Sequence, residues 1–167
     1  MDRLQQQGSR FQSYQATFKA SDVEVNLVDP IQAKPKPRKE DLVRGISKGF
    51  TDHMLEIEWN EDDGWGKPKI SPYHNLQLSP AAKVLHYSQE LFEGTKVFRG
   101  KDGKIRLFRH EMNFERMNRT AERSALPTFD CLEMKELLRK LVSIEQEWVP
   151  HSEDSSLYIR PALIGTE

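Results

Sequence analysis

The sequence has a single cysteine, no long apolar run and almost no net charge. Cys131 alone cannot form an intramolecular disulfide or a cysteine-rich zinc site, which suits a reducing compartment. No apolar run approaches the roughly 20 residues that span a bilayer. A formal net charge of -1 gives no general field for attracting nucleic acid or anionic membranes. We therefore expect a soluble protein that binds neither, in which any anion site is local.

Familiar catalytic and metal-binding motifs are also missing. The five histidines show neither i,i+4 nor short clustered spacing, so the sequence does not support a metal site. It contains no GxGxxG, no GxxxxGK[ST] and no GxSxG motif. These absences leave no pattern typical of a dinucleotide-binding turn, a P-loop or a nucleophile elbow.

A length of 167 residues suits one compact domain. Residues 1–40 are predicted to be an N-terminal arm and a Pro/Lys-rich linker, because PIQAKPKPRKED contains three prolines and four basic residues. Residues 41–167 are predicted to be the domain. Arg3 and Arg10 among glutamines faintly suggest a transit peptide. We expect a cytoplasmic protein, with a mitochondrial location as the alternative.

The apolar pattern predicts a mixed α/β (α+β) fold. FTDHMLEIEW alternates as a half-buried strand does, and TKVFR-GKDG-KIRLFR predicts a hairpin in which Asp102 and Gly103 both take positive φ. Asp130 is the expected N-cap of a second helix, with Glu133 completing a capping box. We predict a mostly antiparallel sheet with helices on one face. Its strands are expected near 52–59, 95–99, 104–109 and 155–160, and its two helices near 110–124 and 131–148.

Two groups of polar residues are candidates for a site. Tyr158 and Arg160 stand two apart on an expected strand, so their side chains share a face that suits a carboxylate or phosphate. An arginine in water at the sheet edge is an equally good interpretation. Arg116 lies in the helix after the hairpin, where its pattern alone favours a solvated surface position. Glu90 and Glu93 are better explained as structural acids paired with Lys96 or Arg99 than as catalytic groups.

Several segments together resemble a known family. They are FTDHML at 50–55, HYSQELFEGTKVFRGKDGKIRLFR at 86–109, NFERM at 113–117, EWVP at 147–150 and SLYIRPALIGTE at 156–167. In order and spacing they resemble the N-terminal part of animal-type branched-chain-amino-acid aminotransferases, which are fold type IV pyridoxal-phosphate enzymes. The resemblance implies the small domain of such an enzyme, with pyridoxal 5′-phosphate as cofactor. It also implies a homodimer in the parent enzyme.

The resemblance assigns roles to individual residues. It implies that Arg116, in NFERM, holds the cofactor phosphate. Tyr158 and Arg160, in YIRP, would reach the substrate. Phe50, Tyr87 and Phe92 would line the side-chain pocket. The implied substrates are branched-chain amino acids, glutamate and their 2-oxo acids.

The family's catalytic lysine, which forms the Schiff base with the cofactor, belongs to a C-terminal large domain. None of the lysines in this sequence occupies the matching place, so no catalytic residue is assigned here. We therefore expect the isolated chain to be inactive. A truncated, non-catalytic interaction or regulatory protein that reuses the domain is the alternative. A nucleic-acid or phosphate module using Arg109, Arg116, Arg119 and Arg123 is disfavoured by the net charge.

Overall fold

The structure is a computed structural model that describes residues 17–37, 49–152 and 154–166. Its helices are α2 (Lys83–Tyr87), α3 (His110–Arg123) and α4 (Cys131–Ile144), with short 3-10 turns η1 (Ala20–Asp22) and η2 (Gln146–Trp148). Its strands are β1 (Glu24–Val25), β2 (His53–Glu56), β3 (Trp59–Asn60), β4 (Gly64–Trp65), β5 (Lys69–Pro72), β6 (Glu90–Phe92), β7 (Thr95–Arg99), β8 (Ile105–Leu107), β9 (Leu157–Ile159) and β10 (Ala162–Ile164). Among these helices, none is both long and apolar enough to cross a membrane.

The described residues form four small sheets instead of one. The strand orders are β8-β7-β9, β1-β5-β2, β10-β6 and β3-β4, and only the β1-β5 pair is parallel. The α+β class and the mostly antiparallel pairing are thus confirmed. The prediction that the strand near 52–59 shares a sheet with the other three is wrong, because β2 pairs with β5. The sequence did not predict this pairing, because a strand of four residues carries no signal of which strand it pairs with.

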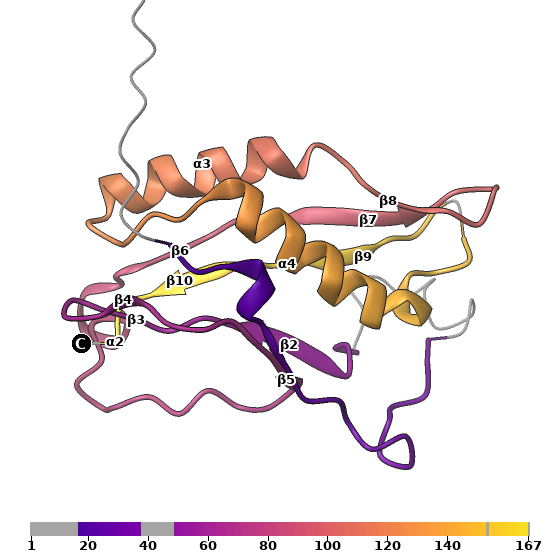
Figure 1. Ribbon diagram of the computed structural model, residues 1–167, viewed down its shortest axis with the longest axis horizontal. Coiled ribbons are helices and arrows are strands. Elements are labelled where there is room, and N and C mark those ends of the chain that lie inside the picture. Colours follow the sequence, from indigo (N-terminus) through magenta and orange to yellow (C-terminus); the bar gives the residue numbers. More distant parts are fainter. Residues whose placement is uncertain (1–16, 38–48, 153, 167) are drawn as a thin grey trace, which may run out of the picture.

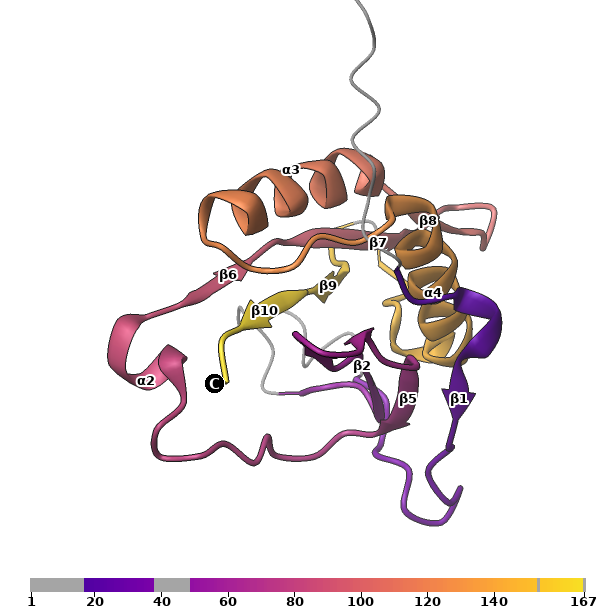
Figure 2. The ribbon, with the colours of Figure 1, turned by 60° about the vertical axis from the view of Figure 1, so that its left-hand side comes forward.

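A long two-stranded antiparallel ribbon runs through the molecule. The chain passes from β6 directly into β7, and its antiparallel partner passes from β9 into β10, as the views in Figures 1 and 2 show. The pairs Phe92↔Ala162 and Thr95↔Ile159 keep one register on both sides of a short break. The break falls at Pro161, which has no N–H to donate, although its carbonyl still accepts from the Glu93 N–H at 2.9 Å.

The core lies between this ribbon and the two long helices. Val97 of β7, Phe114 and Met117 of α3 and Leu137 of α4 are almost fully buried in one cluster. Burying such side chains contributes about 1.5–3 kcal/mol each. Both helices therefore pack on the same face of β7, which confirms that part of the predicted fold (Figure 1).

The β7-β8 hairpin forms as predicted, but its turn differs in detail. Gly103 has a φ of 73°, whereas Asp102 is not among the positive-φ residues. The Gly103 N–H donates to Gly100 O at 2.8 Å and the Gly100 N–H to Lys104 O at 2.9 Å. The loop is thus longer than a two-residue turn, and only its last glycine needs the left-handed conformation.

Part of the segment expected to be arm and linker packs against the domain, although most of its side chains are exposed. Phe18 is 3% exposed, with its ring 5.4 Å from that of Trp65 and 6.1 Å from that of Phe129. Glu133 does not close a capping box on Asp130. It accepts instead from the Ala20 N–H at 2.7 Å, while Asp130 caps α4 alone. The predicted boundary near residue 40 lies outside the described residues, but the packed core begins well before it.

A buried acid cluster fastens the same N-terminal segment. Glu145 accepts from the His53 N–H at 3.0 Å and pairs with His53 Nδ1, and both side chains are almost inaccessible. His53 Nε2 accepts from the Val28 N–H at 2.8 Å, so the ring proton resides on Nδ1. Asp52 accepts from the Lys34 N–H at 2.8 Å and from Trp148 Nε1 at 3.1 Å. The hydrogen bonds that Glu145 and Asp52 accept therefore come from groups of the fold itself, and both acids have a structural role.

Candidate functional site

Arg116 projects from α3 beside Glu93, in the short link between β6 and β7. Its Nε and Nη2 atoms both donate to the Glu93 carboxylate, forming a bidentate pair. The Glu93 side chain is 7% exposed, whereas that of Arg116 is 56% exposed. The Arg116 guanidinium lowers the pKa of Glu93, against the effect of burial, so the carboxylate stays charged. The prediction that Glu93 pairs with Lys96 or Arg99 is wrong, since its partner is Arg116. The sequence could not show that α3 passes back over the link between β6 and β7.

A second side chain of α3 braces the same link. Asn113 Nδ2 donates to Glu93 Oε2 at 3.2 Å and to the Gly94 carbonyl at 3.0 Å. The Gly94 N–H also donates to Glu93 Oε2 at 3.2 Å. The carboxylate of Glu93 is therefore held by a guanidinium, an amide and a backbone N–H, which leaves it little freedom to rotate. Asn113 opens the NFERM segment, but the sequence assigned it no role.

Tyr158 and Arg160 lie together on the outward side of the ribbon, as their spacing predicts. Arg160 donates to the Tyr158 hydroxyl from Nε at 3.1 Å and from Nη2 at 2.8 Å. The Arg160 guanidinium also stacks over the Phe92 ring, 4.2 Å from its centroid. Phe92 is 60% and Tyr158 48% exposed. This aromatic-arginine cluster, made of Phe92, Tyr158 and Arg160, presents a fixed cation on an apolar surface.

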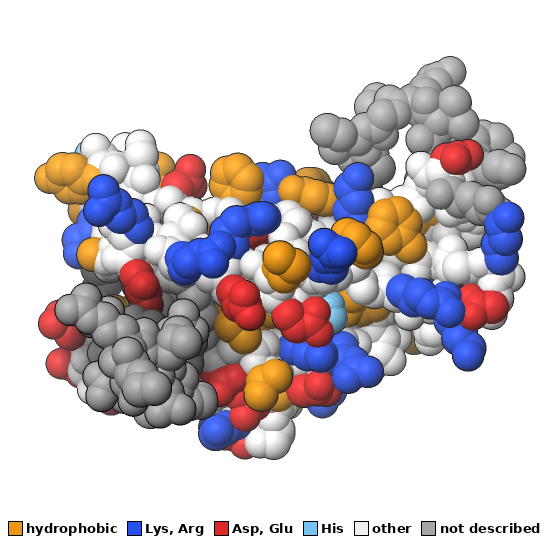
Figure 3. All heavy atoms as spheres, turned by 90° about the horizontal axis from the view of Figure 1, so that it is seen from above, with side chains coloured by type: hydrophobic (Ala, Val, Ile, Leu, Met, Phe, Trp, Pro, Cys, Tyr) orange, Lys and Arg blue, Asp and Glu red, His pale blue; other side chains and the backbone are white. Residues whose placement is uncertain are grey.

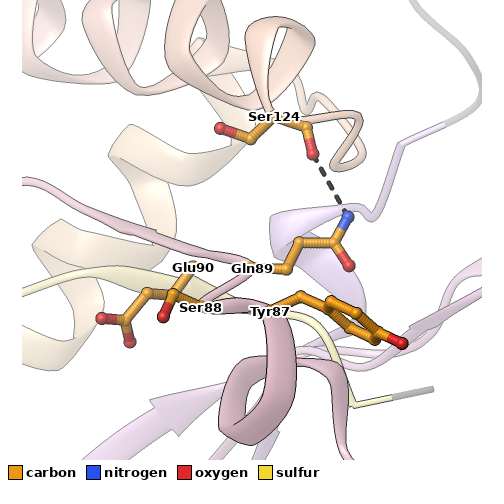
Figure 4. Close-up of a pocket in the computed structure, with 5 residues that line it drawn as sticks. All are labelled: Tyr87, Ser88, Gln89, Glu90 and Ser124. Carbon is orange, nitrogen blue, oxygen red and sulfur yellow. Dashed lines mark hydrogen bonds between the residues drawn. The ribbon is translucent and has the colours of Figure 1, made fainter.

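Phe50 and Tyr87 do not join that cluster in the described contacts. Phe50 stacks on Tyr73 at a ring distance of 4.9 Å, in the segments around β2 and β5. Tyr87 is 80% exposed and lines a shallow cleft with Ser88, Gln89, Glu90 and Ser124, across which Gln89 Nε2 donates to the Ser124 carbonyl at 3.2 Å (Figure 4). The three residues predicted to line the side-chain pocket therefore have different neighbours: Tyr73 for Phe50, the shallow cleft for Tyr87 and Arg160 for Phe92.

A cleft of about 560 Å³ between the β7-β8 hairpin and α4 is lined by four cationic side chains, Arg99, Arg106, Lys135 and Arg139. Arg106 pairs with Asp102 at 2.7 Å and Lys135 with Glu111 at 2.8 Å. Arg99 donates to the Val149 and Gln146 carbonyls. Positive and negative side chains are likewise mixed on the face that carries α3 (Figure 3). The cations of this cleft are thus already engaged, and we assign it no ligand.

No group of three metal-binding side chains forms within the described part of the chain. His110, which lines the basic cleft, is buried with no hydrogen-bond partner on either ring nitrogen, and burial lowers its pKa. Its Nε2 lies 3.3 Å from Glu111 Oε1, and no third metal-binding side chain of the described residues joins the two. Among the residues that the sequence proposed for a site, the two cations are Arg116 and Arg160, which lie on the two sides of the β6-β7 link.

Comparison with known proteins finds similar sequences in enzymes of one kind. It is 49% identical over 152 residues to the mitochondrial branched-chain-amino-acid aminotransferase of Bos taurus, covering 91% of this chain and 38% of that protein. It is 52% identical over 151 residues to the cytosolic enzyme of Mus musculus, covering 90% and 38%. With the cytosolic enzyme of Saccharomyces cerevisiae it shares 54% over 134 residues, covering 80% and 35%.

Comparisons with protein-family models and with solved structures add no further support. No protein-family model matches the sequence. A crystal structure of the Escherichia coli branched-chain amino acid aminotransferase superposes with a TM-score of 0.48 and 21% identity, over 57% of this chain and 30% of that one. That likeness is too low to support an argument, so the relationship depends on the sequence identities. The chain is a homologue of the branched-chain-amino-acid aminotransferases and spans a little over a third of the length of the curated relatives that it matches.

Proposed function

We propose that this chain is the part of a branched-chain-amino-acid transaminase that binds the phosphate of the cofactor and contacts the substrate. The complete protein would transfer the amino group of leucine, isoleucine or valine to 2-oxoglutarate, giving branched-chain 2-oxo acids and glutamate. We further propose that it works as a homodimer. The observation that carries the proposal is the exposed aromatic-arginine cluster, in which Arg160 is fixed by Tyr158 and stacked on Phe92.

Arg116 fits the phosphate of pyridoxal 5′-phosphate. Glu93 occupies its Nε and Nη2 donors, whereas Nη1 makes no hydrogen bond to any described residue, and the side chain is largely exposed. A free N–H edge on a fixed guanidinium suits a dianionic phosphate. When bound, the cofactor supplies the electron sink that carbanion chemistry requires.

The aromatic-arginine cluster can receive both kinds of substrate. Phe92 and the ring of Tyr158 offer an exposed apolar surface against which the side chain of leucine, isoleucine or valine can pack. Arg160 can bind the side-chain carboxylate of glutamate or 2-oxoglutarate, while the Tyr158 hydroxyl helps to hold the guanidinium. One surface thus serves both partners of the exchange.

The proposal is tested by the transfer of the amino group from leucine to 2-oxoglutarate in the complete protein, with Arg116→Ala and Arg116→Lys as variants. Loss of a charge-assisted contact should weaken cofactor affinity by roughly tenfold to a hundredfold in Arg116→Ala. Arg116→Lys should recover only part of it, because an ammonium lacks the planar fork. Arg119→Ala, on the exposed side of the same helix, is the control. Cofactor affinity that is equal in all four proteins would contradict the role of Arg116.

A further inference from the structure

Side chains alternate strictly along the β6-β7 strand. Leu91, Glu93, Thr95 and Val97 are buried, whereas Glu90, Phe92, Lys96 and Phe98 are exposed. Because successive side chains of a strand point to opposite faces, Glu93 is directed towards α3 while Gly94 belongs to the outward face with Phe92. The two neighbouring residues therefore lie between Arg116 on one side and the aromatic-arginine cluster on the other.

Gly94 leaves room for the Tyr158 ring. A Cβ atom at this position would lie 2.8 Å from Tyr158 Cζ and 3.0 Å from Cε2, and closer still to the hydroxyl oxygen. The register that joins Thr95↔Ile159 to Phe92↔Ala162 also sets Gly94 opposite Arg160. Any larger residue would displace the hydroxyl that accepts the two Arg160 hydrogen bonds. The displaced group is the end of an exposed side chain, so the fold itself can tolerate the change.

Glu93 and Gly94 are also joined to each other. Asn113 Nδ2 donates to both the Glu93 carboxylate and the Gly94 carbonyl, and the Gly94 N–H donates to the same carboxylate. A change in the direction of the Glu93 side chain therefore acts on the backbone of Gly94 as well.

We infer that Glu93 and Gly94 position the two half-sites: Glu93 aims Arg116 at the cofactor phosphate, and Gly94 admits the Tyr158 hydroxyl that fixes Arg160. Asn113 couples the two. All three are positioning residues that act through Arg116, Tyr158 and Arg160. The inference rests on the proposed function, and its test separates the two.

The Glu93 half is tested on the 167-residue chain by nuclear magnetic resonance of the arginine Nε–H groups, during titration with pyridoxal 5′-phosphate and with pyridoxal. The wild-type chain should prefer the phosphorylated ligand. Glu93→Gln should lose most of that preference, by roughly tenfold, with pyridoxal binding unchanged, because Gln keeps the shape but not the charge. Glu90→Gln, exposed on the same strand, is the matched control. A merely structural role would weaken both ligands equally.

The Gly94 half is tested by the affinity for glutarate relative to isovalerate. Gly94→Ala should reduce the preference for the dicarboxylate roughly fivefold to tenfold while the chain stays folded, because Arg160 loses its tyrosine partner. Gly66→Ala is the control, since the nearest atom to its added Cβ is 3.4 Å away. An unchanged preference in Gly94→Ala would remove Gly94 from the inference.

The outcomes are distinguishable. A wild-type chain that binds pyridoxal as well as its phosphate contradicts both the proposed role of Arg116 and the inference. A wild-type preference that persists in Glu93→Gln overturns the inference alone. If Glu93→Gln does not fold, Asn113→Ala replaces it, because Asn113 is only partly buried and the ion pair remains. Asn113→Ala should lower both the preference for pyridoxal 5′-phosphate over pyridoxal and the preference for glutarate over isovalerate. If either preference is unchanged, Asn113 does not couple the two half-sites.

Discussion

Two acid-centred clusters in this molecule have similar chemistry and opposite designs. In the first, Glu145 and its partner His53 are both buried, and backbone N–H groups take up the remaining acceptors. In the second, Glu93 is buried but its partner Arg116 extends into solvent with an unused edge. A cluster that satisfies itself serves the fold, whereas a buried acid that holds an exposed cation presents that cation to something else.

The largest effect is expected from breaking the first cluster. Glu145→Ala leaves His53 Nδ1 and the Asp52 and His53 backbone N–H groups without acceptors in the interior. Loss of one partner of such a buried network costs roughly 3–5 kcal/mol of the free energy of unfolding. Urea unfolding measures it, with Glu136→Ala as the control, since Glu136 pairs with Arg139 on the exposed side of α4. Equal losses in the two variants would contradict the structural role of Glu145.

A smaller effect is expected from pH at Asp52. Burial raises its pKa, but the hydrogen bonds from the Lys36 ammonium, the Lys34 N–H and Trp148 outweigh burial and lower the pKa from 3.8 to about 2. Stability from a lowered carboxyl pKa is present above the unfolded value and is lost as the pH falls through the folded one. About 2 kcal/mol should therefore disappear between pH 4 and pH 2.

Asp52→Asn removes the titrating group and should flatten this part of the stability profile. Thermal midpoints measured from pH 6 to pH 2 give the comparison. A profile in the variant as steep as that of the wild type would assign the acid sensitivity to other carboxyl groups, and Asp52 would no longer explain how residues 34–36 are fastened.

The smallest effect on stability is expected at the second cluster. Arg116 is more than half exposed, so Arg116→Ala breaks a pair whose cation is already solvated. The thermal midpoint should fall by roughly 1–3 °C, because Glu93 keeps its hydrogen bonds from Asn113 and the Gly94 N–H and water can enter the space that the Arg116 side chain leaves. A fall as large as that of Glu145→Ala would make Arg116 a structural residue and erase the contrast between the two clusters.

Local patterns predicted the elements that are held by local interactions. The β7-β8 hairpin, α3 and α4 follow from alternation, helical spacing and the Asp130 cap. The pairing of β1 with β5, and of β6 with β10 some 70 residues later in the chain, leaves no mark in such short strands. Phe18 looked like part of an arm because a single aromatic has no periodicity, yet it fills the core beside Trp65.

The candidate site was predictable to a similar extent. The spacing of Tyr158 and Arg160 was enough to place them side by side, because the period of a strand is two. For Arg116 the sequence alone favoured a solvated surface, and only the resemblance gave it a role. The sequence could not assign Glu93 and Asn113 to the site of Arg116. The contacts of Glu93 with Asn113 and with Arg116 depend on how α3 crosses back over the β6-β7 link.

The most direct test of the central claim compares two half-reactions in the complete protein carrying Arg160→Ala. If Arg160 receives the side-chain carboxylate of glutamate, single-turnover rates with glutamate should fall up to about 10²-fold more than those with leucine, which has no second carboxylate. Lys96→Ala, on the same outward face of the ribbon, is the control. Equal losses with the two amino donors would contradict the account, because Arg160 would then only brace the strand before Pro161.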